Sequence, residues 1–159
     1  MSPALRRQTL ADLLHRSAVQ EFIADAKARP GKISFASSGH YGTTHMPMAM
    51  LSRAAGIELN HVAYRGAGPA MNDVIAGQIG CLAAAPATAK PQELGGNIRT
   101  LACVGAQRIA AFPDAPTFKE IGLPEVECYI WAGLFAPRGT PQPIIDKLRA
   151  AMQRWWTPK

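Results

Sequence analysis

Two stretches of the chain follow one plan: ISFASSGHYGTT at residues 33–44 and LNHVAYRGAGPA at residues 59–70. Each begins with a short, mostly apolar run, continues through a loop that contains glycine, and leads into a segment with helical spacing of apolar residues. This order of strand, glycine loop and helix is the repeating unit of a parallel or mixed sheet. The two stretches therefore predict an α/β fold with two strands that enter helices through similar loops.

The flanking segments extend this alternation. Upstream, the spacing predicts a helix over 9–15, and then a second helix that Ser17 opens with Gln20 as its capping-box partner and that Pro30-Gly31 ends. Downstream, Thr43 or Thr44 is expected to cap a helix that ends at Gly56. The apolar residues expected on the inner face of that helix are Met46, Ala49, Met50 and Ala54. The other predicted elements are strands at 33–36, 59–64, 79–84 and 98–104, a helix from Pro69, and a helix at 88–94.

After residue 104 the regular alternation stops. Residues 112–116, Phe-Pro-Asp-Ala-Pro, form a turn-rich connector. A short helix is predicted at 117–121, one or two strands at 127–136, and a last helix that starts at Pro141 or Pro143. The apolar residues of this last helix are Ile144, Ile145, Leu148 and Met152.

Composition excludes several classes of function. The net charge is +6, but the basic residues are scattered rather than gathered in a run or a stripe, which argues against nucleic-acid binding. No apolar run is long enough to cross a bilayer. The three cysteines, Cys81, Cys103 and Cys128, lack CxxC spacing and are interpreted as small buried hydrophobes.

The two glycine loops are the strongest candidates for a binding site. Ligands in open α/β sheets bind beyond the carboxyl ends of the strands, where a helix N-terminus presents unpaired N–H groups and about half a positive charge. Glycine lets the backbone approach a ligand closely, and serine and threonine hydroxyls add donors. Two such loops in one cleft would hold a small carboxylate. The alternative, in which the loops only turn the chain and cap helices and Arg65 is a solvated charge, is left open by the residues alone.

Enzyme motifs are not found. Glycines at 39 and 42 do not make a dinucleotide fingerprint, no P-loop occurs, and Ser37 and Ser38 lack the flanking glycines of a nucleophile elbow. His40, His45 and His61 are a conceivable metal site, but capping or surface histidines are the preferred interpretation, so no metal or cofactor is predicted. The second hypothesis for function is a small α/β enzyme or regulatory module that binds a phosphorylated metabolite.

The order of the segments carries a resemblance. The two loops, followed by PDAPT at 113–117 and LFAPRGTP at 134–141, resemble the receptors of tripartite tricarboxylate transporters, also called Bug solute-binding proteins. The resemblance covers residues 17–152. It implies a periplasmic-binding-protein-like (Venus flytrap) fold of two lobes that hold a small carboxylate, deliver it to membrane permease subunits, and catalyse nothing. The ligand-binding residues that it implies are Ser37, Ser38, Gly39, Gly42, Thr43, Thr44, Tyr64, Arg65, Gly66 and Ala67.

The resemblance also sets the expected domain plan. Residues 1–16 are an atypical N-terminal extension, 17–104 a complete ligand-binding lobe, 105–116 the connector, and 117–159 an incomplete portion of the other lobe. Three departures stand out: no signal peptide or opening half of a first lobe, alanine near Ala84-Ala85-Pro86 where relatives carry polar residues, and a divergent C-terminus. We therefore expect a truncated receptor with impaired function, periplasmic by resemblance but cytoplasmic if made as written.

Overall fold

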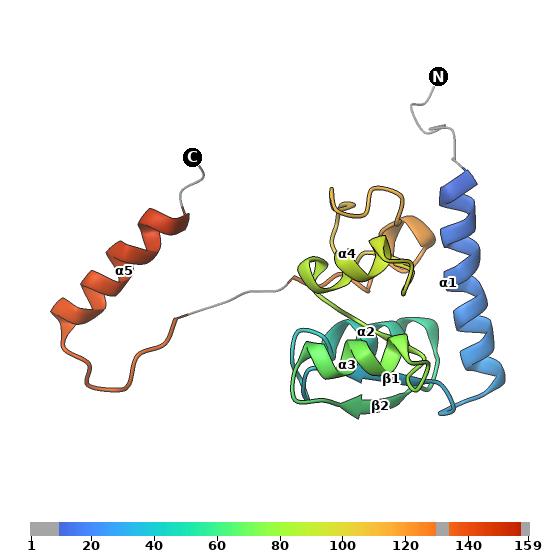
Figure 1. Ribbon diagram of the computed structural model, residues 1–159, viewed down its shortest axis with the longest axis horizontal. Coiled ribbons are helices and arrows are strands. Elements are labelled where there is room, and N and C mark those ends of the chain that lie inside the picture. The colour runs from blue at the N-terminus through green and yellow to red at the C-terminus, as the bar shows by residue number, and fades with distance from the viewer. Residues whose placement is uncertain (1–9, 130–133, 157–159) are drawn as a thin grey trace, which may run out of the picture. The chain divides into compact units, whose positions relative to one another are not determined.

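The computed structural model describes residues 10–129 and 134–156, and the chain divides into two compact units, Met1–Tyr129 and Ile130–Lys159 (Figure 1). The first unit confirms the predicted α/β fold. Its elements are α1 (Leu10–Ala28), β1 (Ser34–Ser37), α2 (Met46–Ala55), β2 (Asn60–Ala63), α3 (Ala67–Ile75), β3 (Cys81–Leu82), α4 (Pro86–Leu94) and the 3-10 turn η1 (Lys119–Ile121). The second unit contains α5 (Gln142–Trp156).

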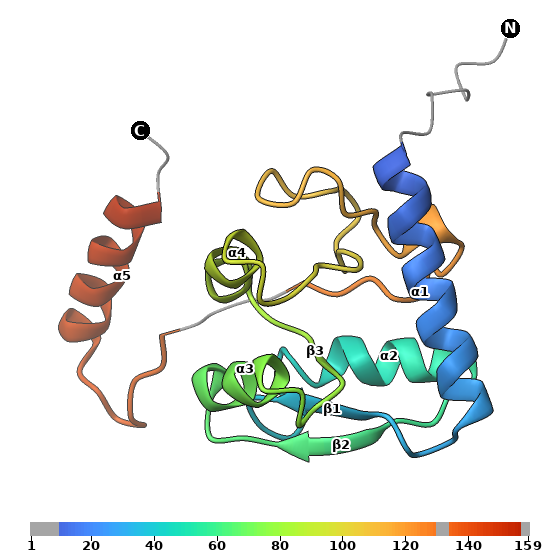
Figure 2. The same cartoon turned by 45° about the vertical axis from the view of Figure 1, so that its right-hand side comes forward.

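The three strands form one parallel sheet in the order β2-β1-β3. Successive side chains of a strand point to opposite faces, and β1 buries both of them. Phe35 packs with α1 and α2, whereas Ala36 packs with Ala70 of α3. Figure 2 shows α1 beside α2 along one side of the unit. The central strand is therefore covered by helices on both faces, as a parallel sheet requires.

The N-terminal segment forms one helix where the sequence predicted two. α1 runs without interruption from Leu10 to Ala28, so the predicted start at Ser17 is wrong. Ser17 and Gln20 match a capping box, but no glycine or proline precedes them within the helix. Backbone N–H groups there find carbonyl partners one turn earlier, and a continuing helix needs no cap.

The buried face of α2 also differs from the prediction. Its most buried apolar side chains are Met48 and Leu51, while Met46 is 42% exposed. The expected inner face was therefore wrong by about half a turn, although Met50 and Ala54 still pack at the edge of the core. The predicted end at Gly56 is confirmed, because Gly56 adopts φ 61°, the left-handed conformation that closes a helix.

The predicted fourth strand does not form. Residues 98–104 contribute one isolated bridge, between Cys103 and Thr117, instead of joining the sheet. Cys103 donates its N–H to the Pro116 carbonyl and accepts from the N–H of Phe118, so its backbone groups are used by the following segment. Within 127–129 and 134–136 the predicted strands are absent too, and 130–133 lie outside the described residues. The short helix at 117–121 is confirmed as the 3-10 turn η1.

Segments on both sides of the predicted connector pack in the first unit. Phe118 and Val126 are buried in the same core cluster as Phe35. The plan of residues 1–16, 17–104, 105–116 and 117–159 concerns a two-lobed protein and stays a prediction.

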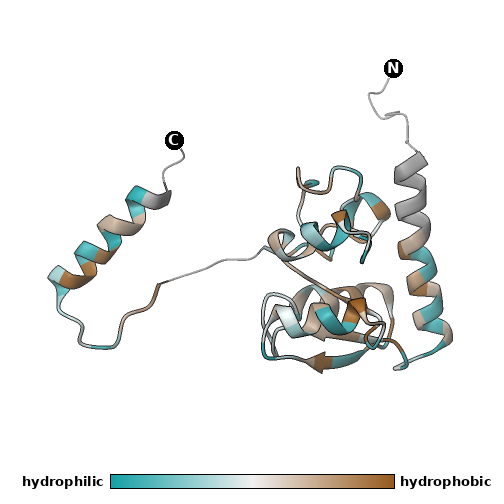
Figure 3. Ribbon diagram, viewed as in Figure 1, coloured by the Kyte–Doolittle hydropathy of each residue, from teal (hydrophilic) through white to brown (hydrophobic). Residues whose placement is uncertain are grey.

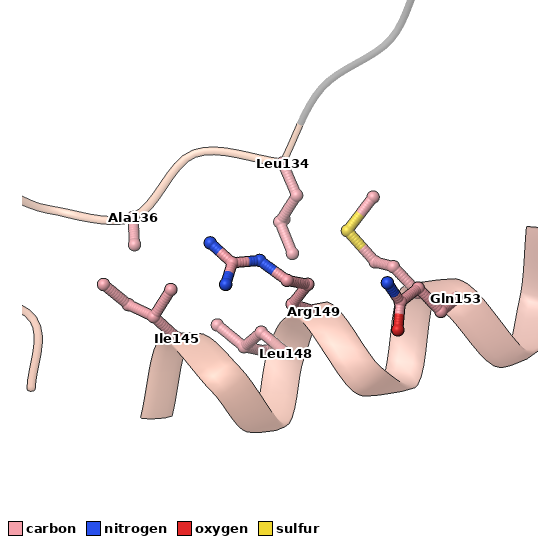
Figure 4. Close-up of a pocket in the computed structure, with 7 residues that line it drawn as sticks. Leu134, Ala136, Ile145, Leu148, Arg149 and Gln153 are labelled. Carbon is pink, nitrogen blue, oxygen red and sulfur yellow. The ribbon is translucent and has the colours of Figure 1, made fainter. Parts of the chain in front are cut away.

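The second unit confirms the last helix. Along α5 polar and apolar residues alternate (Figure 3), and Ile144, Leu148 and Met152 are each at least 40% exposed. Leu134 and Ala136 lie over Ile145 and Leu148, and together they border an open apolar hollow of about 380 Å³ (Figure 4).

Candidate functional site

The two predicted loops leave the sheet at the same edge. β1 and β2 are parallel and in register, with Ser37 opposite Ala63. Immediately beyond, the N–H of Tyr64 donates a 2.9 Å hydrogen bond to the carbonyl of Ser37. Ser38 and Arg65 therefore start their loops from neighbouring points of the carboxyl edge, the position where open α/β sheets bind ligands.

The first loop is held together by side-chain hydroxyls. Ser37 is only 1% exposed, and its Oγ donates to the carbonyl of Gly39 at 2.9 Å and accepts from the Gly39 N–H at 3.2 Å. Thr44 Oγ1 accepts from the N–H of Ser38 at 2.9 Å and lies 2.9 Å from Ser38 Oγ. The structure thus joins four of the predicted site residues in one hydrogen-bonded turn.

The threonines do not cap α2, contrary to the prediction. The N-cap position belongs to His45, and no side chain caps the helix there. The hydroxyl of Thr44 instead accepts from the N–H of Ser38 and contacts the Ser38 hydroxyl. Gly42 instead accepts backbone hydrogen bonds from His45 and Met46, and Thr43 stays exposed. The predicted residues Gly42 and Thr43 therefore form the entry to α2 rather than its cap.

The second loop opens α3 without a side-chain cap. Gly66 is the N-cap at φ 117°, a conformation that favours glycine, and no side chain binds the first N–H groups of the helix. Ala67 and Gly68 follow, while Tyr64 turns its hydroxyl to Asp73 at 2.5 Å. Arg65 is exposed. Among the described residues, no hydrogen bond joins 38–44 to 65–67, so the structure places the loops at one edge without linking them.

A third strand ends at this edge. β3 is parallel to β1, with Leu82 opposite Ala36, and the chain continues through alanines 83–85 into α4. The N-cap of α4 is Ala85, again with no side-chain cap. The side chains at this strand end are apolar, so only backbone groups are available there to bind a polar ligand.

The sequence did not predict the contacts that three histidines make beside the first loop. His61 lies opposite Phe35 in the register, and its ring stacks on Phe35 at 4.7 Å and on His45 at 4.2 Å between ring centroids. The ring of His40 meets His61 edge-on at 4.9 Å. Nε2 of His61 lies 2.7 Å from Oγ of Ser37. The position of His61 one strand over from Phe35 was the signal that could have found this contact.

Burial lowers the pKa of His61 below its ordinary value, and the neighbouring His45 and His40 lower it further. The three histidines meet as the metal hypothesis required, but no group of histidine, cysteine or carboxylate side chains among the described residues could hold a metal ion. Cys81 is a poor nucleophile, because burial raises the pKa of its thiol to about 12. None of the helices in the described part of the chain is long and apolar enough to cross a membrane.

Comparison with known proteins agrees with this arrangement. Residues 11–158 match the model of the tripartite tricarboxylate transporter family receptor. A UPF0065 protein from the tcbD-tcbE intergenic region of Pseudomonas sp. strain P51 is 34% identical over 137 residues, which cover 86% of this chain and 41% of that protein. The chain thus spans about two fifths of that relative's length.

Two solved structures share the fold. The periplasmic binding protein BugD is 33% identical with a TM-score of 0.78, over 85% of this chain and 45% of BugD. MatC from Rhodopseudomonas palustris, solved with bound malate, is 30% identical with a TM-score of 0.79, over 86% of this chain and 46% of MatC. Together with the family match, these likenesses show that the chain belongs to the tripartite tricarboxylate transporter receptor family.

Proposed function

We propose that the carboxyl edge of the β2-β1-β3 sheet binds the carboxylate of a small organic acid, as part of a solute receptor. The observation that carries this proposal is the bond from the Tyr64 N–H to the Ser37 carbonyl, which brings the two glycine loops to one edge in register. The ligand-binding residues proposed are those of the two loops: Ser37, Ser38, Gly39, Gly42, Thr43, Thr44, Tyr64, Arg65, Gly66 and Ala67.

The chemistry of the edge suits an anion. The N-terminus of α3 carries no side-chain cap, so its first N–H groups and helix dipole are available to a carboxylate. Gly66 has no Cβ to shield them, and Arg65 adds a charged donor beside them. The net charge of +6 draws anions toward the chain as a whole.

Family membership supports the rest of the proposal. MatC holds malate in its structure, so a small dicarboxylate is the ligand class we propose here. In this proposal the receptor acts in the periplasm, passes its ligand to membrane permease subunits, and catalyses no reaction. One lobe provides one side of the ligand contacts, so we expect the affinity of this chain for malate to be weak, about millimolar.

An NMR titration of the full chain tests the proposal. Malate should shift the backbone amides of 38–44 and 65–68, and the neutral diamide of malate should not. Arg65→Gln should weaken malate binding about tenfold or more, since a hydrogen bond to a charged group contributes roughly 1.5–3 kcal/mol. Arg53→Gln, a control at an exposed position in the last turn of α2, should leave the affinity unchanged.

The same titration separates the second hypothesis. Shifts of these amides with ATP or a sugar phosphate, and none with malate, would favour a module that binds phosphorylated metabolites. Shifts spread over the whole surface with every anion would show charge attraction without a site.

A further inference from the structure

The turn before α2 is held by a histidine nitrogen. The backbone N–H of Tyr41 donates a 3.1 Å hydrogen bond to Nδ1 of His45. Tyr41 has φ 58°, the left-handed conformation that residues other than glycine rarely adopt, and its side chain is 83% exposed. The turn therefore depends on its backbone partner more than on packing of the tyrosine ring. An imidazole nitrogen accepts a hydrogen bond only when it carries no proton. This loop conformation consequently requires a His45 that is neutral and carries its proton on Nε2.

His61 holds the start of the same loop. The single hydroxyl proton of Ser37 is used on the Gly39 carbonyl, so the 2.7 Å contact to His61 is a bond that Nε2–H of His61 donates. His61 thereby orients the hydroxyl that also receives the Gly39 N–H. The two histidines thus support residues 37–45 at two points, Ser37 at the start and Tyr41 in the middle.

The two supporting rings are stacked on each other. The centroids of His45 and His61 are 4.2 Å apart with an angle of 28° between the planes, and Phe35 lies against His61 from the core side. Two positive charges at this distance repel each other, and burial further disfavours the charge on His61. Protonation of both rings therefore opposes the stack, and protonation of His45 at Nδ1 removes the acceptor of the Tyr41 N–H.

Among the described residues, no ion pair joins a carboxylate to His45 or His61. His40 faces His61 edge-on, and the Tyr41 ring faces His45 at 5.7 Å. On the neighbouring elements, Arg53 lies in the last turn of α2, Asp73 of α3 receives the Tyr64 hydroxyl, and Asp25 of α1 is paired with Arg29. Glu58 lies beside Gly31, at the other end of β1.

We propose that His45 and His61 are positioning residues of the ligand loop, and that they hold residues 37–44 in the binding conformation only while Nδ1 of His45 carries no proton. When acid protonates Nδ1 of His45, the Tyr41 turn is released and the affinity of the edge for a carboxylate decreases. The effect on affinity rests on the proposed carboxylate function, whereas the release of the loop does not.

Long-range ¹H–¹⁵N NMR of the full chain reads the histidine rings directly. At pH 8 His45 and His61 should both show the tautomer with the proton on Nε2. On titration to pH 5, the Tyr41 amide should shift with the same midpoint as the His45 ring. An Nδ1–H tautomer of His45 at pH 8, or a Tyr41 amide that does not respond while His45 titrates, would overturn the proposal.

Two substitutions at one position separate positioning from plain packing. His45→Asn places an amide oxygen near the position of Nδ1 but cannot titrate, so it should keep the closed turn and remove the pH response. His45→Phe keeps a ring for the stack but no acceptor, so the turn should be open at every pH. His15→Gln, in α1, is the matched histidine control and should keep the wild-type response. A pH response that persists in His45→Asn, or that disappears in His15→Gln, contradicts the assignment.

The affinity for malate supplies the second readout. We expect binding at pH 5.5 to be about fivefold or more weaker than at pH 8 in the wild type, a typical coupling between sites, and equal at the two pH values in His45→Asn. Equal wild-type affinities would show that the histidines do not regulate the site. Absence of malate binding at both pH values would remove the proposed function, and the tautomer and Tyr41 readouts would still decide whether the histidines hold the loop.

Discussion

Nε2 of His61 lies 2.7 Å from Oγ of Ser37, which joins a residue in the middle of β2 to the last residue of β1. This contact crosses between adjacent strands at the edge where both loops begin. Because Nε2–H of His61 donates this hydrogen bond, the ring of a half-buried histidine helps to fix the conformation of the candidate site.

The stability of the fold should fall as the pH drops through the histidine range. The pKa of His61 is lowered in the folded chain, mainly by burial, so the unfolded chain takes up protons first. This contribution to stability is complete above about pH 6.5, the unfolded value, and is lost as the pH falls toward the folded value. Thermal unfolding between pH 8 and pH 5 should show a smaller decrease in Tm for His61→Phe than for wild type. An identical decrease in both proteins would assign the pH dependence to other groups.

Removal of the Ser37 hydroxyl should destabilise the fold. Ser37→Ala deletes the buried partner of the Gly39 N–H, the Gly39 carbonyl and the His61 ring. Leaving such partly buried groups unpaired costs about 1–3 kcal/mol, measurable by urea denaturation. The matched control, Ser52→Ala within α2, should change the free energy of unfolding by less than about 0.5 kcal/mol. Equal effects at the two positions would show that the hydroxyl network at Ser37 contributes nothing specific.

Two glycines should respond to alanine in opposite directions. Gly56 closes α2 at φ 61°, so Gly56→Ala should reduce the free energy of unfolding by about 1 kcal/mol. Gly68 lies within α3, and a Cβ there would meet open space. Gly68→Ala should therefore stabilise by roughly 0.5–1 kcal/mol. Chemical denaturation of both variants checks the pair, and destabilisation by Gly68→Ala would mean that the start of α3 is packed more tightly than described.

The amides of α5 should exchange with solvent faster than those of α2. Ile144, Leu148 and Met152 remain 40–51% exposed, whereas Met48 and Leu51 of α2 are at most 8% exposed. A helix gains most of its stability from burying an apolar face, and an isolated helix of this length is marginal. Hydrogen–deuterium exchange followed by mass spectrometry compares the two helices in one experiment. Equal protection would show that α5 is stabilised by contacts beyond those of its own unit.

Much of the fold could be predicted because it is encoded locally. A few neighbouring residues were enough to predict each of three features: the strand at 33–36, the end of a helix at Gly56, and the helix α5. The predictions failed where residues distant in the sequence determine how a segment pairs. The segment 98–104 has the apolar character of a strand, but Cys103 pairs with Pro116 and Phe118 rather than with the sheet.

The candidate site also has features that are encoded locally and features that depend on tertiary structure. The chain alone determined that two glycine loops follow strands and enter helices, because strand and helix periodicity and glycine conformations are local properties. Only the tertiary structure decided that Ser37 and Tyr64 meet at one edge, since strand order and register depend on packing across the sheet. The stack of His45 on His61 was likewise decided by tertiary structure, because the two rings come from different elements that meet over Phe35.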